Sequence, residues 1–365
     1  MERVAASLKS KIMSAEEAAQ LVKSGMSIGL SGFTSVGYPK AVPSALAASG
    51  HAKDLTILVG AAVGDDCDGA LVRAGCVKKR FGHQTNKDLR TAINNGSVSF
   101  SDIHISHFPM NLNQQTLQGV DVAIVECVAI TEDGLYLCAS AGSTDAAVHN
   151  ARFVIAEVNT SVPMGLMGMH DIFEVGIPPH ARIINITDPR DRIGTPYVPC
   201  PPEKIAAIVM TDKLDPPQKF KPVTPATQKV GENVVKFLKD EIAAGRLPAD
   251  PGPIQSGVGS VGNAVLSVLS ASGFKGLTMY TEVMQDAAFS LIDQGVIDFV
   301  SASSIALAAD SRERFFENID QYRDKMVIRP QEISNHPEVI RRLGIIALNT
   351  PVEVEDLKKH GAMSY

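Results

Sequence analysis

The 365-residue chain has no apolar run that approaches about 18 residues, so nothing in it predicts a segment that crosses a membrane. Its N-terminus lacks the apolar centre of a signal peptide and carries acidic residues early, unlike a transit peptide. Five cysteines, an odd number, form no CxxC pair, which favours free thiols in a reducing compartment. These absences together predict a cytoplasmic protein with no membrane partner.

Concentrated positive charge is lacking as well. The formal net charge is −6, and the basic residues form nothing larger than pairs such as Lys78-Lys79 and Arg341-Arg342. A nucleic-acid partner is therefore not expected.

Metal-ligand patterns are incomplete. His104 and His107 have a suitable spacing but no acidic or thiol ligands beside them, and we interpret both as structural histidines. The acidic run 65–68 lacks the spacing and the terminal glutamate of a calcium loop. His170-Asp171 lacks a serine nucleophile in a recognised order, so it predicts no catalytic triad. We predict no metal site.

What the chain does contain is an alternation of apolar, β-branched runs with segments of helix length. Strands are predicted at 26–31, 55–60, 120–127, 152–158, 181–186 and 204–211. Ser14, with Glu17 three residues later, predicts a capping box for a helix that Gly25 ends. Nearly continuous apolar strands separated by helices are typical of a parallel sheet covered on both faces.

The pattern is interrupted once and then resumes. Residues 212–226 hold four prolines and no periodicity, which predicts a linker. A helix is predicted over 226–244, with one apolar stripe formed by Val230, Val234, Phe237, Leu238 and Ile242. A second α/β pattern begins near Pro253. We therefore predict two domains, 1–215 and 216–365.

The second pattern looks like a copy of the first. SGFTSVG (31–37) and SGVGSVG (256–262) agree at five of seven positions, and AVPSALAASG (41–50) and AVLSVLSASG (264–273) agree at seven of ten. We infer that the chain contains two similar units, each with a strand, a glycine-rich turn, a helix and a strand. Because open α/β sheets bind ligands at the carboxyl ends of their strands, we expect the site in a cleft between the units.

The two copies differ at one chemically informative position. Gly60 ends the second strand of the first unit, and Glu282 is its counterpart in the second. A carboxylate directly after an apolar strand is expected to be poorly hydrated. Gly257, Gly259 and Gly262 let the backbone N–H groups of the nearby turn approach an oxyanion or a phosphate. Each feature alone has a common structural explanation, but a carboxylate and amide donors together predict an acyl-transfer site.

Six strings of the sequence are distinctive: GLSGFTSVGYPKAVPSALA (29–47), MHDI (169–172), DRIG (191–194), QSGVGSVGNAV (255–265), YTEVMQDA (280–287) and ISNHPEVIRRLG (333–344). Through them the chain resembles the acetyl-CoA hydrolase/CoA-transferase family, the family I CoA-transferases of the acetate, succinate and propionate type. The resemblance covers almost the whole chain. It implies an α/β fold of two similar open domains with mainly parallel sheets.

The resemblance also implies roles for single residues. Glu282 would be the nucleophile, and Asn335 would line the active site. The turn would contact CoA, with the Val258 N–H as an oxyanion donor, through Gly257, Val258, Gly259, Ser260 and Val261. The implied activity is CoA transfer between an acyl-CoA and a carboxylate, through an acyl-glutamyl anhydride and a glutamyl-CoA thioester. CoA is then a substrate and no cofactor is tightly bound. We also expect a homodimer, the commonest symmetric assembly.

Three departures from the family pattern are visible. Ala62 stands where relatives have a serine near the acyl site, and Pro216-Pro217 stands where some relatives have an arginine. Relatives continue past the segment 347–354 into a glycine-rich stretch, so the second domain is expected to be incomplete. Three other functions stay open. They are a hydrolase with the same residues, a non-catalytic acyl-CoA-binding protein, and a sugar-phosphate isomerase. The isomerase would need a second acid/base residue near Glu282, and the sequence nominates none.

Overall fold

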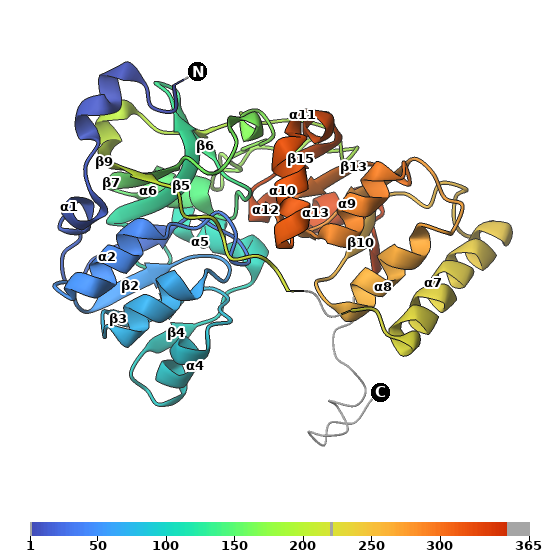
Figure 1. Cartoon of the computed structure of the whole chain (residues 1–365), viewed down its shortest axis with the longest axis horizontal. Helices are drawn as coiled ribbons and strands as arrows, with labels where there is room; N and C mark the ends of the chain where they lie inside the picture. Colours follow the sequence, from blue (N-terminus) through green and yellow to red (C-terminus); the bar gives the residue numbers. More distant parts are fainter. Residues whose placement is uncertain (1, 220–221, 349–365) are drawn as a thin grey trace.

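The structure, a computed structural model, describes residues 2–219 and 222–348, with the side chain of Ser260 left aside. Figure 1 shows the N-terminal half, blue to green, and the C-terminal half, yellow to red, lying side by side, with a segment running across between them. Residues 349–365, at which the expected truncation would fall, lie outside the described residues.

The N-terminal half is built on a nine-stranded sheet. Its strands are β1 (Ser27–Leu30), β2 (Leu55–Leu58), β3 (Val77–Phe81), β4 (Ser99–Ser101), β5 (Val122–Ile130), β6 (Gly134–Leu137), β7 (Phe153–Asn159), β8 (Val198–Pro199) and β9 (Ile205–Thr211). The parallel part has the order β4-β3-β2-β1-β5-β7-β9, and β6 and β8 are antiparallel additions beside β5.

The C-terminal half has a five-stranded parallel sheet in the order β15-β13-β11-β10-β16, and a separate two-stranded pair. The strands of the sheet are β10 (Ile254–Ser256), β11 (Leu277–Tyr280), β13 (Ile297–Ala302), β15 (Met326–Ile328) and β16 (Ile346–Leu348). The parallel pair is β12 (Val283–Met284) with β14 (Ser304–Ile305).

The α-helices surround these sheets. They are α1 (Ala15–Ala19), α2 (Ala41–Ser49), α3 (Ala70–Arg73), α4 (Lys87–Asn94), α5 (Phe108–Asn113), α6 (Thr144–Asn150), α7 (Pro225–Ala243), α8 (Ser260–Leu269), α9 (Asp286–Asp293), α10 (Ala309–Glu317), α11 (Ile319–Tyr322), α12 (Gln331–Ser334) and α13 (Pro337–Leu343). Within the described residues, none of them combines the length and the apolar character that crossing a membrane requires.

The two sheets share one topology. In the first, β1 to β4 are laid side by side in sequence order and β5 lies on the other side of β1. In the second, β10, β11, β13 and β15 follow in the same way and β16 lies on the other side of β10. This agreement confirms the α/β fold with mainly parallel sheets and extends the sequence repeat to strand order. In each sheet the strand order reverses beside the strand that feeds the repeated turn, a place where such folds bind ligands.

Most predicted elements are present. The predicted strands at 26–31, 55–60, 120–127, 152–158 and 204–211 correspond to β1, β2, β5, β7 and β9, and Ser14 and Glu17 form the predicted capping box. The strand predicted at 181–186 is wrong. Ile183 is 82% exposed there, while Ile184 and Ile186 pack into a small cluster with Tyr280 instead of joining a sheet.

Helix α7 forms where predicted, with its packed face shifted from the predicted stripe. Leu238 of that stripe is buried together with Gly231 and Val235, and Val234 and Ile242 are half-buried. Val230 and Phe237 of the stripe are 41% and 59% exposed. The reason is the close approach of α8, since a Cβ at position 231 would come within 2.8 Å of a backbone oxygen of that helix. A glycine, which the pattern did not weigh, therefore sets the packed face.

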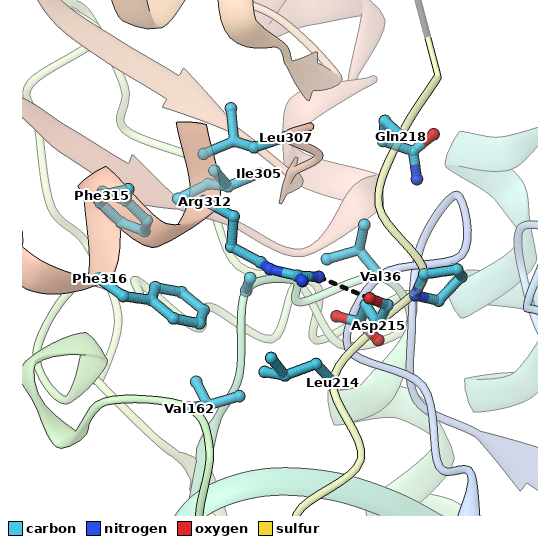
Figure 2. A pocket seen from close by; sticks show the side chains of 12 residues that line it. Val36, Val162, Leu214, Asp215, Gln218, Ile305, Leu307, Arg312, Phe315 and Phe316 are labelled. Carbon is cyan, nitrogen blue, oxygen red and sulfur yellow. Dashed lines mark hydrogen bonds between the residues drawn. The ribbon is translucent and has the colours of Figure 1, made fainter. Parts of the chain in front are cut away.

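The two halves meet along an apolar seam. One hydrophobic cluster includes Val125 from β5 together with Phe289 from α9 and Ile305 from β14. Figure 2 shows where the connecting segment crosses this seam. There the Asp215 carboxylate pairs with Lys40 at 2.8 Å. The backbone carbonyl of Asp215 accepts a 2.5 Å hydrogen bond from Arg312, which lies in α10.

The hollow drawn in Figure 2 is about 20 Å³ in volume, room for about one water molecule. It is a packing gap of the seam. The division into domains at 215/216 stays a prediction.

Candidate active site

An open cavity of about 550 Å³ lies where the two halves meet. Glu282 and Asn335 line it from the C-terminal half, and His83 and the segment 102–105 line it from the N-terminal half. Cavities of this size are typical of small-molecule sites. The predicted nucleophile and the predicted active-site asparagine therefore share one cavity.

Glu282 stands at the carboxyl edge of the second sheet, between β11 and β12. Its carbonyl accepts N–H groups from Ser303 at 2.8 Å and Ser304 at 3.2 Å, which fixes the backbone. The side chain is half-buried, and burial raises the pKa of its carboxyl group, while a hydrogen bond with the Asn335 side chain opposes that rise in pKa. The carboxylate is consequently more basic than an exposed glutamate.

Gln331 connects the two walls of the cavity. Its Nε2 donates to the Ile105 carbonyl at 2.7 Å, and its own carbonyl accepts a 3.0 Å hydrogen bond from Asn335 Nδ2. A Cβ at Gly60 would lie 2.2 Å from Gln331 Nε2. The absence of a side chain at position 60, the counterpart of Glu282 in the repeat, therefore leaves room for the glutamine that holds this wall.

The predicted CoA-binding turn begins beside Glu282 in space. Thr281 Oγ1 donates to the Ser256 carbonyl at 3.1 Å, and Gln285 Nε2 donates to the Gly257 carbonyl at 3.4 Å. The side chain of Val258 is 64% exposed. The turn is thus tied to residues on both sides of Glu282, although residues 257–261 do not line the Glu282 cavity themselves.

The end of this turn is an open helix N-terminus. Gly259, at φ +147°, precedes α8, which Ser260 begins, and the N-cap glycine has no side chain to cap it. Among the described residues, the N–H groups of Val258 and Gly259 have no hydrogen-bond acceptor. Free N–H groups at a helix N-terminus favour an anion.

The helix that follows the repeated turn in the first unit has an occupied N-terminus instead. The Glu157 carboxylate accepts the N–H groups of Lys40, Ala41 and Val42 at 2.8, 2.9 and 2.6 Å, at the start of α2. Glu157 is completely buried. The protein's own carboxylate therefore fills the N-terminus of α2, whereas the start of α8 keeps the free amides of Val258 and Gly259 among the described residues.

Residues 1–210 match the acetyl-CoA hydrolase/transferase N-terminal domain. The chain is 43% identical over 353 residues to the succinyl-CoA:acetate CoA-transferase of Clostridium kluyveri, covering 95% of this chain and 66% of that protein. It is 38% identical over 371 residues to the acetyl-CoA hydrolase of Schizosaccharomyces pombe, covering 95% of this chain and 71% of that protein. The chain belongs to the acetyl-CoA hydrolase/transferase family.

This member of the acetyl-CoA hydrolase/transferase family spans about two thirds of the length of those relatives. Its fold is similar to that of RipA from Yersinia pestis, with a TM-score of 0.70 at 16% identity, covering 93% of this chain and 73% of that one. At such low identity the likeness shows the fold alone.

Two of the motifs that carried the family resemblance hold the structure together. The Asp171 carboxylate of MHDI accepts the N–H groups of Ile193 and Gly194 in DRIG, at 3.0 and 2.6 Å, and pairs with Arg329 from just after β15. All charged groups of that pair are buried. His170 is buried beside it, so the motif takes no part in the cavity.

Sequence reasoning missed the N-terminal wall of the cavity. His104 was interpreted as structural, yet it is exposed and lines the same cavity as Glu282, together with Asp102 and His83. The only available signal was the polar residues of DIHISH, which alternate with isoleucines as in an ordinary half-buried segment. No cluster of metal-ligating side chains occurs in the part of the chain that the structure describes.

Proposed function

We propose that this chain catalyses transfer of CoA between an acyl-CoA and a short carboxylate, with Glu282 as the nucleophile. The supporting observation is the position of Glu282 at a sheet edge inside the cavity between the halves, with a raised carboxyl pKa and Asn335 beside it. Membership of a family that contains CoA-transferases and acetyl-CoA hydrolases supports the same chemistry.

The proposed reaction consists of four successive substitutions at carbonyl carbons, and every leaving group is accounted for. A Glu282 oxygen attacks the thioester carbonyl and expels CoA thiolate, leaving an acyl-glutamyl anhydride. The thiolate then attacks the glutamyl carbonyl, which releases the first carboxylate and leaves a glutamyl-CoA thioester. A second carboxylate reverses both steps. Each tetrahedral intermediate carries an oxyanion, for which the proposed donor is the Val258 N–H.

The turn Gly257, Val258, Gly259, Ser260 and Val261 is the proposed contact for CoA. Its support is the contrast with the first unit, in which the equivalent helix start is already filled by Glu157. A phosphate or an oxyanion at the open start of α8 would receive amide donors and the positive end of the helix dipole. CoA is in this proposal a substrate, and no further cofactor takes part.

The test is chemical trapping on Glu282. The protein is incubated with acetyl-CoA and treated with hydroxylamine, and its peptides are analysed by mass spectrometry. A hydroxamate at Glu282 is expected in the wild type and none in Glu282→Gln. Glu338→Gln, which changes an exposed carboxylate paired with Arg341, is the matched control and should label normally. Unlabelled wild-type protein would end the proposal.

Asn335→Ala offers a finer test of the site. The mutation removes the hydrogen bond that favours the ionised form of Glu282, so the carboxyl pKa should rise further. The rate should then fall at a higher pH on acidification than in the wild type. An unchanged acid limb of kcat/KM would show that Asn335 does not contact the reacting carboxylate.

Hydrolysis of acyl-CoA on the same residues is the second candidate. It is favoured by the exposed wall of the cavity, where Asp102 and His104 are in contact with solvent. Water that reaches the anhydride would turn transfer into hydrolysis. The two are separated by whether CoA release from acetyl-CoA requires an added acid. A homodimer and a cytoplasmic location complete the proposal.

A further inference from the structure

The N-terminal wall of the Glu282 cavity combines apolar and polar side chains. The segment 102–105 runs along it, and in this segment Ile103 and Ile105 are half-buried while His104 between them is exposed. Two apolar groups around one polar group match a short carbon chain that ends in a polar head.

This wall is rigidly held. The Ile105 carbonyl accepts the 2.7 Å hydrogen bond from Gln331, and the His104 carbonyl accepts the N–H groups of His107 at 2.9 Å and Phe108 at 3.1 Å. The backbone that carries the His104 ring is thus fixed before any ligand arrives. Fixed donors bind a ligand without a large ordering cost.

The His104 ring has one nitrogen engaged and one free. Nδ1 lies 2.9 Å from the hydroxyl of Ser106, which is buried. With this hydroxyl donating to Nδ1, Nε2 carries the hydrogen and is a donor. Among the described residues, Nε2 has no partner, so its donor is available to a ligand in the cavity.

The other polar groups of the cavity are less suited to an anion. Glu282 and Asp102 are acids, and an Asp102 oxygen accepts the N–H of Ile103 at 3.0 Å. Asn335 is engaged with Glu282 and with the Gln331 carbonyl. His83 is exposed, and no hydrogen bond fixes its ring among the described residues. Of the described residues that line this cavity, His104 is the one whose ring is held by a hydrogen bond and still has an unpartnered nitrogen, and this nitrogen is a donor in the tautomer in which Ser106 donates to Nδ1.

We propose that His104 selects short dicarboxylates as substrates, by donating from Nε2 to the carboxylate that does not react. The flanking isoleucines would contact the methylene groups between the two ends. The proposal rests on the proposed function, in which Glu282 takes the reacting carboxyl group. A monocarboxylate of equal length would leave the His104 donor to water.

The test compares succinate with butyrate, two four-carbon acids that differ in the distal carboxylate. Asparagine places its amide near the position of Nδ1 and glutamine near that of Nε2. His104→Asn and His104→Leu should therefore lower the ratio of kcat/KM for succinate to that for butyrate about tenfold or more, mainly through KM. His104→Gln should restore most of the ratio.

His107→Asn is the matched control, because its ring lies 5.1 Å from that of His104 but does not line the cavity. The proposal is overturned if His104→Asn and His104→Leu leave the ratio unchanged, or if His107→Asn or His83→Asn lowers it instead. Equal losses for both acids would also overturn it, since they indicate a general defect.

A binding measurement separates this inference from the proposed function. Wild-type protein that transfers CoA to no short carboxylate, acetate and propionate included, would refute the function, and NMR titration would then decide on His104. Tenfold tighter binding of succinate than of butyrate, lost in His104→Asn, supports the inference without turnover. Equal affinities in the wild type would overturn it.

Discussion

His170 should make the protein sensitive to mild acid. Its ring is 1% exposed, neither ring nitrogen has a hydrogen bond of good geometry among the described residues, and the Arg192 guanidinium lies nearby. Burial is the larger cause and the positive charge of Arg192 the second, and together they lower the pKa of His170 from 6.5 to about 4. The carbonyls of Cys138 and Ser140 oppose this lowering of the pKa in part. The folded protein therefore holds the neutral ring, and the unfolded chain takes up a proton first.

The size of the effect follows from the difference in pKa. Because the folded pKa is the lower one, the stability that depends on neutral His170 is complete above pH 6.5 and is lost as pH falls toward 4. Each pKa unit corresponds to about 1.4 kcal/mol, so the total loss is about 3 kcal/mol, and about 2 kcal/mol is already lost at about pH 5.

The assay is urea unfolding followed by circular dichroism, from neutral pH down to about pH 5, for wild type and His170→Leu. Leucine has a similar volume and cannot be protonated, so the variant should not lose the roughly 2 kcal/mol that His170 costs the wild type by about pH 5. The difference in free energy of unfolding, variant minus wild type, should therefore rise by about 2 kcal/mol from neutral pH to about pH 5. His180→Leu, at an exposed position, is the control and should show no such gain. Parallel curves for wild type and His170→Leu would refute the reasoning.

Three further changes have definite expected outcomes. Burial raises the pKa of Glu282, and the attacking group must be ionised, so kcat/KM should fall on acidification at a pH above that of an ordinary glutamate, which a pH–rate profile measures. Gly60→Ala should displace the Gln331 side chain, because the added Cβ would lie 2.2 Å from Nε2. We expect a clear loss in kcat and little change in the melting temperature. Arg329→Met leaves the buried Asp171 carboxylate without its partner and should cost about 3–5 kcal/mol in urea unfolding, whereas Arg329→Met with Asp171→Leu should recover part of that loss.

The sequence was most informative where strands are buried on both faces. The strands β5 and β7 read as continuous apolar runs, and the structure buries nearly all of their residues. The pattern failed for β3, because Lys78 and Lys79 face solvent and only Arg80 is buried there. It also failed at 181–186, where alternating isoleucines pack against the other half of the molecule. Periodicity reports that a side chain is buried but not which element covers it.

The site was predictable only in part, for a similar reason. Glu282 could be found by aligning the two copies, since a carboxylate replaced a glycine at one strand end, and Asn335 followed from the family resemblance. His104 could not be found in this way. It shares a cavity with Glu282 where Gln331 binds the Ile105 carbonyl, a contact between segments far apart in the chain. Long-range contacts of this kind leave no local pattern.

The carboxylate of Glu157 has a consequence for stoichiometry. A duplicated fold would be expected to offer two equivalent anion positions, yet an external phosphate in the first unit would have to displace a buried carboxylate from three N–H groups. Titration with CoA should therefore saturate at one equivalent per chain. Under the proposed function, duplication has yielded one half that binds CoA and one half that supports it.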